Sequence, residues 1–66
     1  MQITINGLAA DVADRITVAA LVRDRAQGRS RIAVAVNAEV VPRSQWEATR
    51  LGPGDGIELL AATAGG

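Results

Sequence analysis

The residues that could carry out chemistry in this chain are few, and their types exclude most side-chain catalysis. His, Cys, Tyr and Lys are all absent, which removes the commonest general base and the strongest side-chain nucleophile. The usual soft metal ligands are missing with them, so we expect no metal site. Neither Ser30 nor Ser44 has a histidine with which to form a hydrolytic pair, so a hydrolase is the least favoured class of protein.

The acidic side chains are the remaining candidates for acid–base chemistry, and they are scattered singly along the chain. Catalysis of that kind needs carboxylates in pairs, whereas isolated acidic groups are mostly exposed on protein surfaces. We therefore interpret them as a solvated surface. They are Asp11, Asp14, Asp24, Glu39, Glu47, Asp55 and Glu58.

The sequence closes with LLAATAGG, and its two final glycines can pack no side chain. Gly makes up about 7% of average proteins, so two terminal glycines arise by chance in roughly 0.5% of chains. The ends of domains are often frayed, and small residues there can be incidental. Whether Gly65 and Gly66 have a function depends on the elements that precede them.

Length and composition indicate one small domain with neither a nucleic-acid nor a membrane partner. The 66 residues are 48% hydrophobic and carry no net charge, whereas a nucleic-acid binder normally has a basic surplus. No apolar run approaches the roughly 20 residues of a membrane span, and no signal-peptide pattern opens the sequence. Because there is no cysteine to support export, the cytoplasm is the expected location.

The first half of the chain predicts a hairpin followed by a helix. Residues 2–5 alternate polar and apolar side chains, which indicates a half-buried strand. Asn6–Gly7 is a strong signal for a two-residue turn, so a second, antiparallel strand is expected over residues 8–13. Thr17 can cap a helix over residues 18–27.

The second half predicts another hairpin and a final strand. Residues 32–36 alternate again, Asn37–Ala38 makes a tight turn, and a short strand follows over residues 39–41. A short helical turn then places Trp46 against the core, because burying its large surface is favourable. After a Gly- and Pro-rich turn, the alternating segment IELLAATA, residues 57–64, forms the last strand.

These elements bury their apolar faces best when one sheet wraps around the helix, with the last strand in its middle and parallel to the first. We therefore predict an α+β protein with a β-grasp fold, in which a mixed sheet of about four to five strands covers one helix. Residues 1–62 would form this domain and residues 63–66 a flexible C-terminal tail. The predicted core is Ile3, Ile5, Val18, Leu21, Val22, Ile32, Val34, Val36, Ile57 and Leu59.

The opposite, outward face of the sheet should meet solvent and be polar, yet its residues are mostly small or apolar. One interpretation is an ordinary surface, since single exposed apolar residues need no explanation. The other, favoured by the nearness of the chain end, is a face on which a partner docks. The outward positions are Thr4, Ala33, Ala35, Leu60 and Ala62, bordered by Arg31 and Glu58.

Two segments of the chain resemble the sulfur carrier proteins of thiamin biosynthesis, the ThiS family. They are VNAEVVPRSQW, residues 36–46, and GDGIELLAATAGG, residues 54–66. Members of this family are ubiquitin-like β-grasp domains that end on Gly-Gly, and the likeness in length and element order covers essentially the whole chain. Its specific part is the segment VNAEVVPR together with the two final glycines.

The resemblance implies a carrier on which partner enzymes act, not an enzyme, and a monomer when free. An adenylating (activating) enzyme would use ATP to activate the carboxylate of Gly66, and a sulfur-donor enzyme would turn it into a thiocarboxylate. Thiazole synthase would then take the sulfur. ATP would belong to the activating enzyme, so the chain itself would bind no cofactor.

The same family chemistry gives the small residues near the chain end a role. Gly65 and Ala64 would follow Gly66 into a narrow channel, where a larger side chain would clash. The outward face would supply the docking contacts. Its partner-binding residues would be Leu60, Ala62, Ala33, Ala35 and Glu58.

Other interpretations stay open from the sequence. The small subunit of molybdopterin synthase is a similar carrier, although such chains tend to be longer, and a conjugating ubiquitin-like modifier would share the fold. A non-catalytic β-grasp interaction module would make the tail incidental. Arg43 has two interpretations as well, as a contact for an acidic patch on a partner or as a solvated surface residue.

Overall fold

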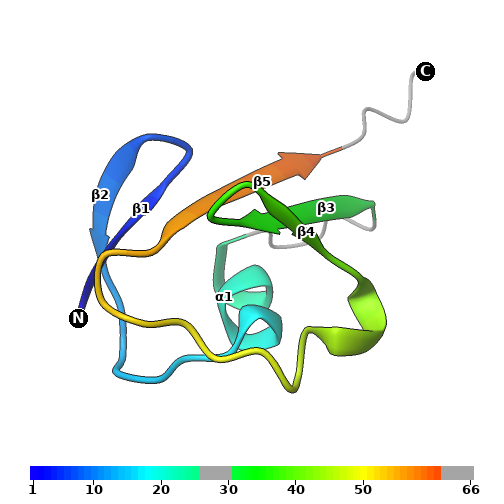
Figure 1. The fold of residues 1–66 in the computed structure, drawn as a ribbon, viewed down its shortest axis with the longest axis horizontal. Helices are drawn as coiled ribbons and strands as arrows, with labels where there is room; N and C mark the ends of the chain where they lie inside the picture. Colours follow the sequence, from blue (N-terminus) through cyan, green and yellow to red (C-terminus); the bar gives the residue numbers. More distant parts are fainter. Residues whose placement is uncertain (26–30, 62–66) are drawn as a thin grey trace.

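Five strands and one α-helix make up the described part of the chain, residues 1–25 and 31–61, in a computed structural model. The strands form one sheet, and the helix packs against one of its faces (Figure 1). The elements in chain order are β1 (Gln2–Ile5), β2 (Leu8–Asp11), α1 (Val18–Arg25), β3 (Ile32–Val36), β4 (Glu39–Val41), the short 3-10 helix η1 (Arg43–Gln45) and β5 (Gly56–Ala61).

The last strand lies at the centre of the sheet, whose strand order is β2-β1-β5-β3-β4. β5 runs parallel to β1 and antiparallel to β3, while each outer pair is an antiparallel hairpin. The sheet is therefore mixed, with one helix on one face. The predicted α+β class, β-grasp arrangement and central position of the last strand are confirmed.

Both hairpins turn through two residues with left-handed backbone conformations. The φ angles are 51° and 83° at Asn6–Gly7, and 50° and 70° at Asn37–Ala38, as expected for turns that match the twist of the flanking strands. The strand predicted over residues 8–13 is shorter and ends at Asp11. Asp11 pairs with Gln2, the first residue of β1, and one further pair of bonds follows, from the amide of Val12 to the carbonyl of Met1 at 2.9 Å and from the terminal ammonium of Met1 to the carbonyl of Val12 at 2.7 Å.

The helix begins where its capping residue predicts. The hydroxyl of Thr17 accepts a hydrogen bond from the amide of Ala20 at 3.1 Å, which satisfies one of the free N–H groups of the first turn. The helix is described to Arg25, and its predicted end at residue 27 lies outside the described residues.

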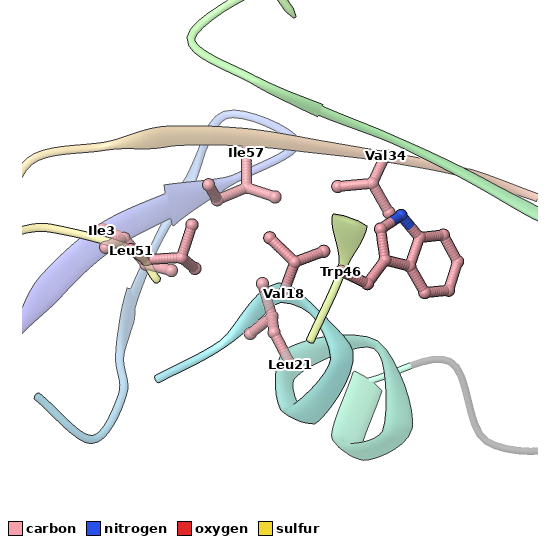
Figure 2. Close-up of a cluster of buried hydrophobic side chains, with 7 residues drawn as sticks. All are labelled: Ile3, Val18, Leu21, Val34, Trp46, Leu51 and Ile57. Carbon is pink, nitrogen blue, oxygen red and sulfur yellow. The ribbon is translucent and has the colours of Figure 1, made fainter. Parts of the chain in front are cut away.

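The core lies between α1 and the inner face of the sheet, and Figure 2 shows side chains from both layers pointing toward one another. Five of the predicted core residues are buried, and the other five are half-buried and pack against them. Trp46 is buried as predicted, and its indole N–H donates to the carbonyl of Val41 at 2.9 Å. The buried residues are Ile3, Val18, Leu21, Val34, Trp46, Leu51 and Ile57.

Leu51 is the core residue that the sequence did not predict. It sits in a loop, and main-chain hydrogen bonds hold that loop against the start of α1. The amide of Leu51 donates to the carbonyl of Ile16 at 2.9 Å, and the amide of Val18 donates to the carbonyl of Thr49 at 2.9 Å. These bonds direct one leucine of an otherwise polar segment into the core.

Candidate functional site

The outward face of the central strands forms from alternate residues of β3 and β5. Successive side chains of a strand point to opposite faces, and Val34 and Ile57 point into the core. The strand register places Ala33 directly opposite Leu60 and Ala35 directly opposite Glu58. Four of the predicted docking residues therefore form two adjacent cross-strand pairs on the face away from the helix.

Val40 extends this surface onto β4. It lies opposite Ala35, and 76% of its surface is exposed, compared with 63% for Leu60. The sequence offered a signal, since the turn at Asn37–Ala38 fixes the register of β4 and so brings Val40 beside Ala35. We call Ala33, Ala35, Val40, Glu58 and Leu60 the outer patch.

The outer patch consists mainly of short side chains that are open to solvent, and its one charged residue is Glu58. Ala33, Glu58 and Leu60 are exposed and Ala35 is half-buried. The alanine side chains leave the backbone of β3 accessible to a partner surface, while Leu60 and Val40 project above them. Such a face fits a shallow apolar surface on a partner protein.

The outer patch is close in sequence to the residues predicted to react. Leu60 is the next-to-last residue of β5, and Gly66 is six positions further along the chain. Six residues span at most about 20 Å when fully extended. A partner that covers the outer patch can therefore have its active site no further than this from Leu60, if Gly66 is the residue it acts on.

Four of the predicted site residues lie outside the described part of the chain. They are Ala62, Ala64, Gly65 and Gly66.

Asp55 is the acidic side chain with the clearest structural role. One carboxylate oxygen accepts from the amide of Gly52 at 2.8 Å, and the other accepts from the side-chain amide of Asn37 at 3.0 Å. These bonds tie the loop before β5 to the turn between β3 and β4. Asp55 is half-buried, so the interpretation of every acidic residue as solvated surface is wrong here: Asp55 closes a turn.

Arg43 contacts the core. Its guanidinium lies over the indole ring of Trp46, 5.1 Å from the ring centroid, a distance at which a cation and an aromatic face attract. This contact supports a structural role for Arg43 at the start of η1.

Two further observations concern residues 1–25 and 31–61 only. Within these ranges no three His, Cys, Asp or Glu residues come together in a way that could hold a metal ion. No helix in the same ranges has the length and apolar character needed to cross a membrane.

Comparison with known proteins gives consistent matches over the whole chain. The model of the ThiS family matches residues 3–66. The sulfur carrier protein ThiS of Escherichia coli (strain K12) is 38% identical over 66 residues, which is all of both chains.

Two solved structures of thiamine biosynthesis proteins also match the chain. The crystal structure of a thiamine biosynthesis protein (ThiS) from Geobacter metallireducens superposes with a TM-score of 0.85 at 30% identity, covering all of both chains. An NMR solution structure of a thiamine biosynthesis protein from the same organism gives a TM-score of 0.79 at 30% identity, covering all of this chain and 88% of the other.

Proposed function

The chain belongs to the ThiS family of sulfur carriers in thiamine biosynthesis, and we propose that its reactive group is the terminal carboxylate of Gly66. The observation that carries this proposal is the reach of the family match, which extends through Gly65 to Gly66. Membership in the family confirms the predicted resemblance and the predicted role as a carrier on which enzymes act.

The chemistry follows from the poor reactivity of a carboxylate, whose oxygen is a bad leaving group. In our proposal a carboxylate oxygen of Gly66 attacks the α-phosphorus of ATP, and pyrophosphate leaves. A sulfur nucleophile at the oxidation level of sulfide then attacks the acyl carbon, and AMP leaves with the bonding electron pair. The product is a thiocarboxylate on Gly66, which thiazole synthase uses as its source of sulfur.

The partners of the chain are enzymes of the thiamine pathway, as family membership implies. More specifically, the proposed partners are an adenylating enzyme, a sulfur-donor enzyme and thiazole synthase. ATP binds to the adenylating enzyme, and the carrier binds no cofactor of its own. We place this chemistry in the cytoplasm and expect the free carrier to be a monomer.

We assign docking to the outer patch and reaction to the end of the chain. Residues 1–62 act as the β-grasp domain and residues 63–66 as the tail that enters the partner. A tail must be ordered when it is bound, at a cost of about 1–2 kcal/mol per residue. Contacts at Leu60 and its neighbours offset this cost, and the small side chains of Ala64 and Gly65 limit clashes in a narrow channel. Ala62 is assigned to the docking surface with the outer patch.

The direct test is the intact mass of the chain after incubation with an adenylating enzyme, ATP and inorganic sulfide. We expect a mass gain equal to the replacement of one oxygen by sulfur, localised to Gly66 by fragmentation. Omission of ATP should abolish the gain, because the carboxylate would then have no activated intermediate.

Two variants of the chain end serve as controls. Deletion of Gly66 and addition of one alanine after it should both prevent the mass gain and leave the thermal unfolding midpoint unchanged. A variant that still accepts sulfur would refute the terminal-carboxylate mechanism. A wild-type chain that is never adenylated would instead favour the interaction module, in which the final glycines are incidental.

A further inference from the structure

Strand β5 pairs with its two neighbouring strands over unequal lengths. β3 pairs with it along its length, from Val36 opposite Ile57 to Ile32 opposite Ala61. β1 pairs only with its beginning, through Thr4 opposite Gly56 and Ile5 opposite Ile57, because β1 ends there. The second half of β5, which leads to the reactive end of the chain, therefore has a strand neighbour on one side only.

The side chain of Asn6 takes the place of the missing strand. A regular parallel ladder would offer the amide of Leu59 the main-chain carbonyl of Asn6, but Asn6 has already turned away with a φ of 51°. Its side-chain oxygen accepts from the Leu59 amide at 2.9 Å, and its side-chain nitrogen donates to the Leu59 carbonyl at 3.2 Å. One side-chain amide thus satisfies both main-chain groups of Leu59.

The flank of this part of β5 that faces away from β3 borders open space, although Leu59 packs against the core. A hollow of about 450 Å³ opens beside it on the helix side of the sheet, and Leu59 is only half-buried. The hollow is lined by Ile5, Asn6, Leu8, Ala9, Ala10, Arg25, Ile32, Leu59 and Ala61. On this flank, the two hydrogen bonds between Asn6 and Leu59 take the place of strand pairing.

The other turn asparagine provides a matched contrast at the opposite end of β5. Asn37 also has a left-handed backbone, with a φ of 50°. Its side-chain oxygen accepts from the amide of Gly56 at 2.9 Å, and its main-chain N–H donates to the Gly56 carbonyl at 2.8 Å. Here, however, β5 also has strand partners on both sides, through Thr4 opposite Gly56 and Val36 opposite Ile57.

We propose that Asn6 is a positioning residue, which fixes the end of β5 and so the direction in which the reactive tail leaves the domain. The proposal rests on the proposed function, because it supposes that an enzyme acts on Gly66. Asn6 bonds to the main chain of Leu59, which is not a residue of the outer patch. Its effect passes through the main chain of Leu59, and it should alter the rate of reaction more than the strength of docking.

Three variants test this role in the full chain. Asn6→Gly keeps the left-handed turn, since glycine adopts positive φ freely, and removes both hydrogen bonds to Leu59. Asn6→Asp keeps the acceptor for the Leu59 amide and removes the donor to its carbonyl. Asn37→Gly is the same substitution at the matched turn, where it removes the side-chain acceptor for the Gly56 amide and the side-chain donor to Asp55.

The first readout is amide hydrogen exchange. In Asn6→Gly we expect exchange at Leu59 to accelerate about tenfold, the scale that loss of modest hydrogen bonds produces. Asn6→Asp should lie between this variant and wild type. Unchanged exchange at Leu59 in Asn6→Gly would show that Asn6 does not hold this strand, and would overturn the proposal.

The second readout is pyrophosphate release by the adenylating enzyme, with the chain as the varied substrate. Asn6→Gly should lower kcat about five- to hundredfold, the range that misplacement of a reacting group produces, while KM stays close to that of wild type. Asn37→Gly should leave kcat unchanged. A wild-type kcat in Asn6→Gly, or an equal loss in Asn37→Gly, would overturn the positioning role. Failure of wild type to react would refute the proposed function instead, and the exchange comparison would still decide whether Asn6 holds Leu59.

Discussion

Each face of β5 carries a large aliphatic side chain, and the two side chains have opposite surroundings. Ile57 is 1% exposed and packs among the core residues, whereas Leu60, three positions later on the same strand, is 63% exposed. Their chemistry is nearly the same, so hydrophobicity alone does not separate them. The alternation of the strand does, because it assigns Ile57 to the helix side and Leu60 to the outward side.

This difference separates apolar residues that stabilise the fold from those available for binding. Burial of a large aliphatic side chain stabilises a protein by about 1.5–3 kcal/mol, and Ile57 obtains that gain within the chain. Leu60 obtains little of it until a partner covers it. The inner face should therefore determine stability, and the outer patch should determine affinity.

The largest effect is expected from Ile57→Ala. Removing a fully buried isoleucine side chain should lower the free energy of unfolding by about 2–5 kcal/mol, because the lost burial adds to the cost of the cavity. Chemical denaturation followed by circular dichroism measures this. The matched control is Leu60→Ala on the same strand, for which the change should stay within about 0.5 kcal/mol. Equal losses in the two variants would contradict the division between the faces.

Trp46→Phe probes the inner face through a polar contact. Phenylalanine keeps most of the buried ring but has no N–H, so the carbonyl of Val41 loses its 2.9 Å partner. Val41 is half-buried and still pairs with Val34 in the sheet, so the cost is that of one lost hydrogen bond, about 0.5–1.5 kcal/mol, and we expect a loss of unfolding free energy in this range. Thermal and chemical unfolding should both show it.

Arg43→Ala is the control for the second contact of the same ring. It removes the cation that lies 5.1 Å from the ring centroid, a contact worth about 0.5–1 kcal/mol. A double-mutant cycle with Trp46→Ala isolates this contact from the other interactions of Arg43, and a coupling energy of zero would show that it does not stabilise the fold.

Regular patterns in the sequence were enough to predict most of the inner face. Alternation in residues 2–5 and 32–36 identified Ile3 and Val34, and Asn6–Gly7 fixed the first hairpin. Leu51 could not be found in this way, because its turn-rich segment has no regular alternation of apolar and polar residues. Its burial depends on main-chain hydrogen bonds to Ile16 across the fold, and sequence alone does not reveal such pairing.

The residues that share the outer patch were predicted in part. Four residues of the outer patch follow from strand alternation, but Val40 requires the register of β4 relative to β3. The hydrogen bonds between Asn6 and Leu59 join residues 53 positions apart. Asn6 is recognisable in sequence only as a turn former, because its second role depends on β1 ending before β5 does.

Leu60→Arg tests the part of the outer patch that lies on the central strand β5. Arginine is tolerated on an exposed strand position, so the free energy of unfolding should change by no more than about 0.5 kcal/mol. Placing a charge opposite an apolar partner surface should weaken binding to the adenylating enzyme about tenfold or more. Isothermal titration with the purified enzyme measures the affinity. An unchanged affinity would move the docking surface away from Leu60.

Val40→Lys should have a smaller effect of the same kind. Val40 is on the edge strand β4, where lysine is well accepted, so folding should be unaffected. At the border of the outer patch the new charge can stay in water, and rim positions contribute little to affinity. We expect binding to weaken about two- to fivefold.

The control for Val40→Lys is Leu8→Lys on the other edge strand. Leu8 is 74% exposed and Val40 is 76% exposed, so the two variants add the same charge at equally open positions on opposite edges of the sheet. Because Leu8 pairs with Ile5, whose side chain is on the helix side, Leu8→Lys should leave the affinity unchanged. If both variants weakened binding equally, the effect would come from net charge and not from the outer patch. A loss at Val40 as large as that of Leu60→Arg would instead place the centre of docking over β3 and β4.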